Sequence, residues 1–439
     1  MSARSKKYLS IQPNNVPASG KVSYARGNPV LTMTLGRQDA MLDLSSIRLS
    51  GDLNVWRDAA GTLHPTDAAA TELRGSHKLG VFSAIDQIVI RHAETKQVVE
   101  HIRHYGRFMA SYLPVMASMQ DTSGHLSESA LIMPNYQSYR DNVIRNSGAS
   151  PFCIPLPTGL TLGVDGGLPL DKVPIELEIH LASDSQFFYS EDGTTANIAN
   201  CFYELSNLEL SVEVAPSVPS PDQGALVFNS ITSYFSTLET TNSIINFNLG
   251  LSKVLAAFVN FVPSSFVNNL GQDGFLTYMP SIAPDAAGTG GGSLANLETI
   301  SFLKNGERFP SAFEVDTNYS DNNETSVVDP QVIKGFLGSI IPERAHKRTT
   351  IGPENTNRRY KVNQNATDGY RLMPESGAAY GVGVLYDMLD SEGVDFKNSQ
   401  FSIQMSNQLT DGNPNSAYLF IKSKVVVAWS STMGIEVIA

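Results

Sequence analysis

The segment Val173-Pro-Ile-Glu-Leu-Glu-Ile-His-Leu181 alternates apolar and polar residues with a period of two. Successive side chains of an extended strand point to opposite faces, so this pattern predicts a strand with one buried face. The same alternation recurs at 47–55, 203–215, 400–407 and 417–429. Antiparallel strands that bury only one face are the natural interpretation, and they predict an all-β protein.

Helical periodicity is convincing in two places. The first is 97–113, where Val98, Ile102, Tyr105, Met109 and Leu113 share one stripe and Pro114 follows. The second is 330–341, which begins with an Asp-Pro pair at 329–330 and is followed by a proline at 342. We therefore expect one short helix in each half of the chain.

The order of elements is repeated in the two halves. Each half has strands, one helix, an irregular stretch and then a pair of strands, and the 439 residues are enough for two domains. Between the halves lies Ala215-Pro-Ser-Val-Pro-Ser-Pro221, whose prolines disfavour both helix and central strand. We predict an N-terminal arm at 1–20, a first domain at 21–215, a linker at 216–223 and a second domain at 224–439. Two tandem eight-stranded jelly-roll β-sandwiches, each with a short helix in a connecting loop, are the expected fold.

The composition favours a protein that contacts copies of itself. Charged residues make up 17% of the chain and the formal net charge is −12. A neutral polar surface costs less to desolvate than a charged one, and a net acidic chain is a poor general binder of nucleic acid. The two cysteines provide no disulfide framework. Without a signal peptide or an apolar run long enough to span a bilayer, we expect synthesis in the cytoplasm.

Motifs for catalysis or metal binding are weak. His101 and His104 would lie at i and i+3 on the first helix with His92 upstream, but no HExxH pattern or acid cluster accompanies them. The glycines at 288 and 290–292 lack the Lys-Ser/Thr of a phosphate loop. The glutamates at 176, 178, 209 and 213 lie on the polar faces of predicted strands. We therefore predict no catalytic residue, no metal site, no cofactor and no small-molecule substrate.

Four short segments together carry a family resemblance. They are Pro155-Leu-Pro-Thr-Gly-Leu-Thr-Leu-Gly163, Gly167-Leu-Pro-Leu170, the strand at 173–181 and Tyr203-Glu-Leu-Ser-Asn-Leu-Glu-Leu-Ser-Val212. They resemble the end of the first jelly roll in double jelly-roll major capsid proteins of tailless icosahedral DNA viruses, and are most similar to those of polinton-like viruses and virophages. The chain departs from larger relatives by lacking long tower insertions and by ending on a predicted strand at 434–438.

This resemblance implies a structural role in a virion. It implies a homotrimer of pseudo-hexagonal outline, with both sandwiches perpendicular to an icosahedral shell that encloses the genome. Neighbouring capsomers, penton proteins and minor capsid proteins are the implied partners, and the family carries no catalytic residues.

Two groups of residues are candidates for contacts within such a shell. Arg4, Lys6 and Lys7 form a basic N-terminal cluster that could face the genome or a neighbouring subunit. A second cluster, Tyr136, Tyr139, Arg140 and Arg145, is expected at an intersubunit contact. A further basic stretch runs from 344 to 361, and a solvated loop is its commoner interpretation.

Two alternative functions remain open from the sequence. A tandem β-sandwich attachment protein of lectin type would hold a glycan in its long loops, and it would need an exposed aromatic platform. Only Trp56 and Trp429 are available as tryptophans, and Trp429 continues an apolar strand. A jelly-roll enzyme would need a histidine-rich metal site inside one sandwich.

Overall fold

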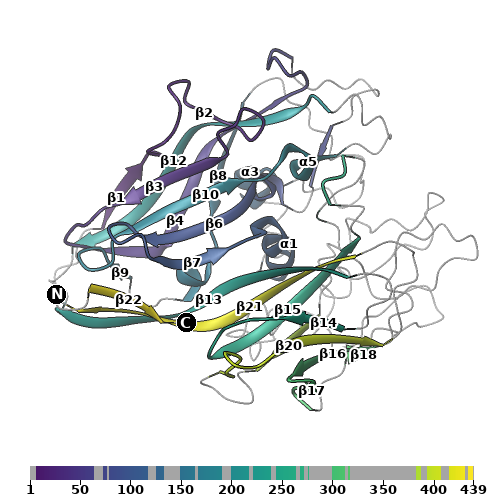
Figure 1. The fold of residues 1–439 in the computed structure, drawn as a ribbon. Helices are drawn as coiled ribbons and strands as arrows, with labels where there is room; N and C mark the ends of the chain where they lie inside the picture. The colour runs from purple at the N-terminus through teal and green to yellow at the C-terminus, as the bar shows by residue number, and fades with distance from the viewer. Residues whose placement is uncertain are drawn as a thin grey trace, which may run out of the picture.

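The structure is a computed structural model, and it describes most of the first half of the chain and a smaller share of the second. The described residues are 6–63, 73–76, 79–116, 125–132, 149–163, 167–189, 199–216, 221–238, 244–263, 267–270, 275, 299–311, 315–316, 382–386, 393–406, 415–430 and 434–438. Within these ranges strands predominate, and they form two sandwiches (Figure 1).

The first sandwich contains two main sheets. Its strands are β1 (Lys7–Ile11), β2 (Lys21–Val22), β3 (Val30–Leu35), β4 (Ala40–Trp56), β6 (Ile85–His92), β7 (Val98–Ile102), β8 (Ser150–Pro155), β9 (Leu168–Pro169), β10 (Ile175–Leu181) and β12 (Phe202–Pro216). One sheet has the order β1-β12-β4-β8, in which β2 also pairs with β12 and β9 also pairs with β4. The other sheet has the order β3-β10-β6-β7. Two short strands, β5 (Arg74–Gly75) and β11 (Phe188–Tyr189), pair with each other.

Strand β10 shows how the alternating pattern builds a sheet. Its apolar residues Ile175, Leu177, Ile179 and Leu181 are all buried, whereas Glu176, Glu178 and His180 are partly exposed. Antiparallel ladders join it to β3 on one side and to β6 on the other. The quoted segment is therefore a central strand, as predicted.

The second sandwich also has two sheets. Its strands are β13 (Gln223–Leu238), β14 (Ile244–Phe247), β15 (Val254–Pro263), β16 (Thr299–Lys304), β17 (Glu307–Arg308), β18 (Val315–Asp316), β19 (Val382–Leu385), β20 (Phe401–Ser406), β21 (Asn415–Ser430) and β22 (Gly434–Ile438). One sheet has the order β13-β21-β15-β19 with β22 beside β21, and we call it the inner sheet. The other has the order β14-β20-β16-β17, with β18 beside β16.

The helices differ from the sequence prediction. They are α1 (Tyr105–Met116), α3 (His125–Ala130), α4 (Gly159–Gly163), α5 (Asp184–Phe187) and a 3-10 turn at Gly80–Ala84. The prediction of a helix at 97–113 was wrong for the first half of that range, because Val98–Ile102 is strand β7 and pairs with β6. The helix expected at 330–341 lies outside the described residues. None of the helices in the described ranges is long and apolar enough to cross a membrane.

Part of the predicted N-terminal arm is a strand of the first sandwich. Lys7–Ile11 forms β1, which pairs with Leu210–Val214 of β12 in the same chain. At least this part of the arm belongs to the first sandwich. The remaining predicted domain boundaries stay predictions, although β12 ends at Pro216 and β13 begins at Gln223 on either side of the predicted linker.

The apolar interior is divided into two clusters of unequal extent. The smaller cluster fills the second sandwich and includes Phe302, Ile403 and Leu419. The larger fills the first sandwich but also includes Phe258, Phe420 and other residues of the inner sheet. The inner sheet is therefore covered on two faces, by its own sandwich and by the first one (Figure 1).

A half-buried carboxyl in the first sandwich gives the protein a pH-dependent contribution to stability. Asp184 begins α5, and its Oδ1 accepts a hydrogen bond from the Tyr203 backbone N–H at 3.0 Å. Burial raises the pKa of Asp184 to about 6 from an ordinary value of 3.8. Because the folded state holds this proton more tightly than the unfolded state, the contribution is fully present below about pH 4 and is lost as the pH rises through 6.

We expect Asp184→Asn to stabilise the protein at pH 7.5. The amide keeps an oxygen for the Tyr203 N–H and removes the cost of burying a charge, which we put at about 1–2 kcal/mol after allowance for partial solvent access. Thermal melting at pH 7.5 and pH 4.5 should show the gain only at the higher pH. The exposed Asp39→Asn is the control, and it should not raise the melting temperature at pH 7.5. An equal gain at both pH values would contradict the assignment.

Candidate functional site

Two of the four carboxylates that the sequence offers as possible paired acids, Glu176 and Glu178, have separate basic partners. Glu178 contacts His180 Nε2 at 2.6 Å and Arg91 Nε at 3.3 Å on the outer face of the β3-β10-β6-β7 sheet. Glu176 contacts Lys96 Nζ at 2.7 Å. Within the described ranges, no three His, Cys, Asp or Glu side chains gather in an arrangement that could hold a metal ion.

The three histidines considered for a metal site have separate surroundings. His92 is buried in β6, and its Nδ1 accepts a hydrogen bond from the Thr95 backbone N–H at 3.0 Å. His101 lies on β7 and contacts Gln87 Oε1 at 3.1 Å, and burial lowers its pKa. His104 has a φ of +53° at the turn before α1. The helix on which His101 and His104 were expected to share a face begins only after both residues.

The most extensive feature outside the two sandwich interiors is the junction between them. Helix α1 of the first sandwich packs on the inner sheet of the second through buried aromatic rings. The centroid of the Phe108 ring lies 5.9 Å from that of Phe420 and 6.5 Å from that of Phe258. The Phe258 and Phe420 rings are stacked, with their centroids 5.1 Å apart. All three side chains are fully buried. Burial of this kind is typical of a protein interior and not of a mobile contact between domains.

Polar contacts surround this aromatic group. Asn260 of β15 donates a hydrogen bond from Nδ2 to Ser111 Oγ of α1, and both residues are completely buried. The Arg103 backbone N–H donates to Ser233 Oγ of β13 at 2.8 Å. The Arg107 guanidinium lies 4.9 Å from the centre of the Tyr418 ring. Each contact joins the first sandwich to the second, so the junction has directional as well as apolar contacts.

A single carboxylate forms the centre of the polar contacts. Glu100 lies on β7 and is 2% exposed. Its Oε1 accepts hydrogen bonds from the backbone N–H of Gly159 at 2.9 Å and of Ile231 at 2.8 Å, and its Oε2 accepts from the Leu160 N–H at 2.9 Å. The Ser230 hydroxyl donates to Oε1 at 3.3 Å. Burial raises the pKa of Glu100, and the three backbone N–H groups oppose this shift by stabilising its charge.

The inner sheet also contacts the first sandwich at its β22 end. The Gln97 amide, in the orientation that satisfies both of its ends, donates to Ile435 O at 3.0 Å and accepts from Val437 N at 3.1 Å on β22. The Trp429 indole donates a hydrogen bond at 3.2 Å to the carbonyl oxygen of Pro221, in the segment between β12 and β13. Ile435, Val437 and Trp429 pack against the larger apolar cluster. The junction therefore extends from α1 to β22.

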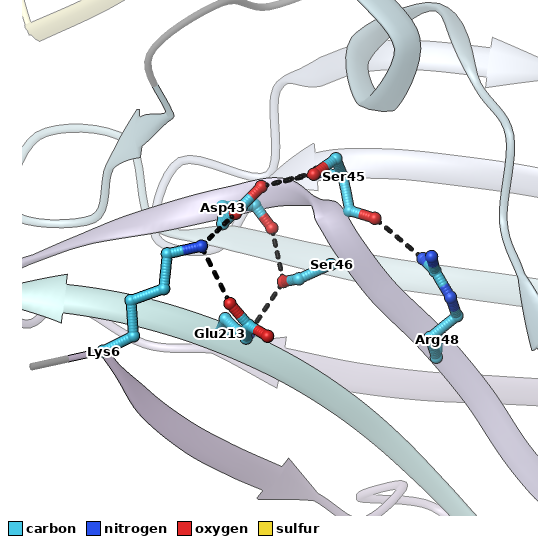
Figure 2. A network of polar contacts seen from close by, with 6 residues as sticks. All are labelled: Lys6, Asp43, Ser45, Ser46, Arg48 and Glu213. Carbon is cyan, nitrogen blue, oxygen red and sulfur yellow. Dashed lines mark hydrogen bonds and ion pairs between the residues drawn. The ribbon is translucent and has the colours of Figure 1, made fainter.

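The N-terminal strand is held by a network of charged and hydroxyl groups (Figure 2). Lys6 Nζ lies 2.9 Å from both Asp43 Oδ2 and Glu213 Oε2, at a break in the β4–β12 ladder. Ser45 Oγ donates to Asp43 Oδ1 at 2.6 Å, and the Glu213 backbone N–H donates to Ser46 Oγ at 2.7 Å. Hydrogen bonds from Ser45 and Lys6 lower the pKa of Asp43. The ammonium of Lys6 thus has two carboxylate partners within its own chain.

The other residues predicted for contacts are placed as follows. Lys7 is exposed at the start of β1, at the edge of its sheet. Arg4, Tyr136, Tyr139, Arg140 and Arg145 lie outside the described residues, as do the 344–361 basic stretch and the glycines at 288–292.

The residues at the centre of the junction were not singled out by the sequence analysis. Glu100 is an acid within the apolar segment Val98-Val-Glu-His-Ile102, and that position is the one signal that could have marked it. Gly159 lies in the Pro155–Gly163 segment, which carried the family resemblance but gave no hint of a contact with β13.

Comparison with known proteins identifies the fold. No family model matches the sequence, and the search of curated proteins finds no match to it. Solved structures do match. The VP54 protein of PBCV-1, in a structure fitted into a reconstruction of the Sputnik virophage, has 12% identity and a TM-score of 0.55, and the match covers 100% of this chain and 98% of that one. A structure from the Sputnik virophage has 10% identity and a TM-score of 0.56, covering 99% and 88%. The Faustovirus major capsid protein has 8% identity and a TM-score of 0.53, covering 98% and 91%.

These matches extend over nearly the whole of each chain. They show that this chain has the double jelly-roll fold, and they confirm the tandem jelly-roll architecture predicted from the alternating segments.

Proposed function

We propose that this chain is a major capsid protein of a tailless icosahedral DNA virus. Three copies would form a pseudo-hexagonal capsomer, and capsomers would tile the shell that encloses the genome. The role would be structural and not catalytic, and the protein would reside in the virion after synthesis in the host cytoplasm. The full-length likeness to capsid proteins such as that of Faustovirus supports this function.

The observation that carries the proposal is the buried junction. A shell subunit must have a fixed shape, because small differences in angle between subunits accumulate around a closed surface. Here the two sandwiches share one continuous apolar cluster, and the carboxylate of Glu100 joins them through hydrogen bonds. Two similar rigid blocks in each chain, repeated three times, would give the six lobes of a pseudo-hexagon.

The surface chemistry is suited to lateral contacts between copies. Only 17% of the residues are charged, so facing subunits would bury few unpaired ions. Tyr136, Tyr139, Arg140 and Arg145 remain the proposed intersubunit cluster. Penton and minor capsid proteins are the proposed further partners. A weak genome contact would rest on Arg4 and Lys7, because Lys6 is already paired with Asp43 and Glu213.

The assembly state tests this function. We expect light scattering after size exclusion, at micromolar concentration, to give a mass of about 142 kDa, three times the 47.5 kDa of one chain. The trimer should persist on dilution, since obligate contacts between capsid subunits are extensive. A stable species of 47.5 kDa at that concentration would count against the proposal.

A further inference from the structure

An ionisable side chain at the centre of an apolar junction requires an explanation. Transfer of a carboxylate from water into a protein interior is costly, and an apolar residue of similar volume is often as stable or more so. Glu100 is nevertheless 2% exposed, next to the larger apolar cluster. Its hydrogen bonds must therefore provide something that an apolar side chain at the same position could not.

The four donors to Glu100 come from both sandwiches. Gly159 and Leu160 belong to α4 of the first sandwich, while Ser230 and Ile231 belong to β13 of the second. Strand β13 is the edge of the inner sheet, and its Ile231 N–H points away from the β21 ladder toward Glu100. One carboxylate thus fixes the position of the edge strand β13 relative to helix α4.

The aromatic contacts do not impose such a constraint. Apolar attraction is non-directional, so the packing of Phe108, Phe258 and Phe420 holds the two sandwiches together but defines their angle less sharply than hydrogen bonds do. Hydrogen bonds between 2.8 and 2.9 Å lose strength steeply when the donors shift or tilt. The orientation of the two sandwiches is thus restricted mainly by the polar contacts, and Glu100 joins two backbone N–H groups of α4 to a backbone N–H and a hydroxyl of β13.

We propose that Glu100 is the positioning residue that fixes the angle between the two sandwiches, and that this angle determines whether capsomers close into a shell. The second clause rests on the proposed capsid function, but the first does not. Glu100 acts through the backbone of α4 and β13 and touches no partner itself.

The test compares Glu100→Gln with a matched variant that weakens the junction without removing its hydrogen bonds. In Glu100→Gln the new NH2 group faces N–H donors, so at least one donor loses its acceptor. In Phe108→Leu the apolar contact with Phe258 and Phe420 is reduced, while Glu100 and its donors are retained. Both variants should melt below the natural chain, so loss of stability alone does not separate them.

Two readouts separate a positioning role from a general loss of stability. Amide hydrogen exchange at Ile231 or at Leu160, whichever faces the new NH2 group, should rise at least tenfold in Glu100→Gln. The rise should be much smaller in Phe108→Leu when both variants are measured the same number of degrees below their melting temperatures. Cryo-electron microscopy of the purified protein should give one angle between the sandwiches for the natural chain and for Phe108→Leu. For Glu100→Gln it should give a broad range of angles, and assembly should produce open or irregular particles.

A single, unchanged angle in Glu100→Gln would overturn the proposal, whatever the melting temperature. If that variant does not fold, Glu100→Asp takes its place, because its shorter side chain cannot reach α4 and β13 together. The exchange and angle measurements can be made on monomers as well as trimers. Failure of the capsid function would therefore appear as absence of trimers in the natural chain, and would be distinct from failure of this inference.

Discussion

Replacement of Gly159 by alanine is expected to destabilise the protein by more than about 4 kcal/mol, enough to abolish soluble expression or lower the melting temperature by several degrees. A Cβ at this position would overlap the Asn229 carbonyl oxygen and would lie 2.7 Å from Ser230 Cα, well inside van der Waals contact. Both atoms belong to the backbone of β13, which pairs with β21 along its whole length. The strand cannot move aside without shifting that ladder.

The control for this substitution is Gly36→Ala. Gly36 also lies in the first sandwich, and a Cβ there would meet no atom within 4 Å. Soluble yield and the midpoint of thermal unfolding should be near those of the natural chain for Gly36→Ala, and strongly reduced for Gly159→Ala. Equal behaviour of the two variants would mean that α4 and β13 are not in close contact.

Truncation of Phe420 to alanine is expected to cost about 3–5 kcal/mol, the usual range for loss of a buried phenylalanine. Phe420 is fully buried on β21, where it meets Phe258 of its own sheet and Phe108 of helix α1. The cavity would open at the junction itself, and neither sandwich could collapse into it without tilting. Calorimetry should show a lower melting temperature and a split of one transition into two.

Phe235→Ala is the matched control for Phe420→Ala. Phe235 lies on neighbouring strand β13 of the same sheet and is 48% exposed at the rim of the junction. Its ring contacts Tyr418 at 5.1 Å, so some packing is lost, but no closed cavity forms. We expect a loss below about 1 kcal/mol and a single transition. If both variants melted alike, the junction would not be packed as an interior.

Strand positions could be predicted well because the signal is local. In β10 and β12 one face is buried and the other is partly exposed to solvent, so apolar and polar residues alternate directly in the sequence. The same holds for β21, although its inner sheet is covered on both faces for part of its length, which makes the apolar run at 417–421 more continuous.

The helix prediction at 97–113 failed for an identifiable reason. Val98 and Ile102 are four residues apart, which suits a helix, but the same spacing also suits a strand. Pairing of Ile102 with Ile88 across the hairpin decided between the two. Strand β7 ends at Ile102, and a turn follows in which His104 has a positive φ. Helix α1 then begins at Tyr105. Tertiary pairing overrode a local pattern that fitted both structures.

The junction could not be predicted because its partners are distant in sequence. Glu100 bonds to residues about 60 and 130 positions away, and a single sequence carries no signal for such pairs. In the sequence, Glu100 looked like an ordinary polar residue on the exposed face of an amphipathic segment. Lys6 was placed in a basic cluster on local charge alone, whereas its actual partner Glu213 is 207 positions away.

The central claim is that the two jelly rolls form one rigid unit built to assemble with copies of itself. Single-particle cryo-electron microscopy of the purified natural chain is its most direct test. We expect pseudo-hexagonal particles of three chains, with six lobes at fixed positions and both sandwiches of every chain in the same relative orientation. Isolated chains whose two lobes adopt variable orientations would contradict it.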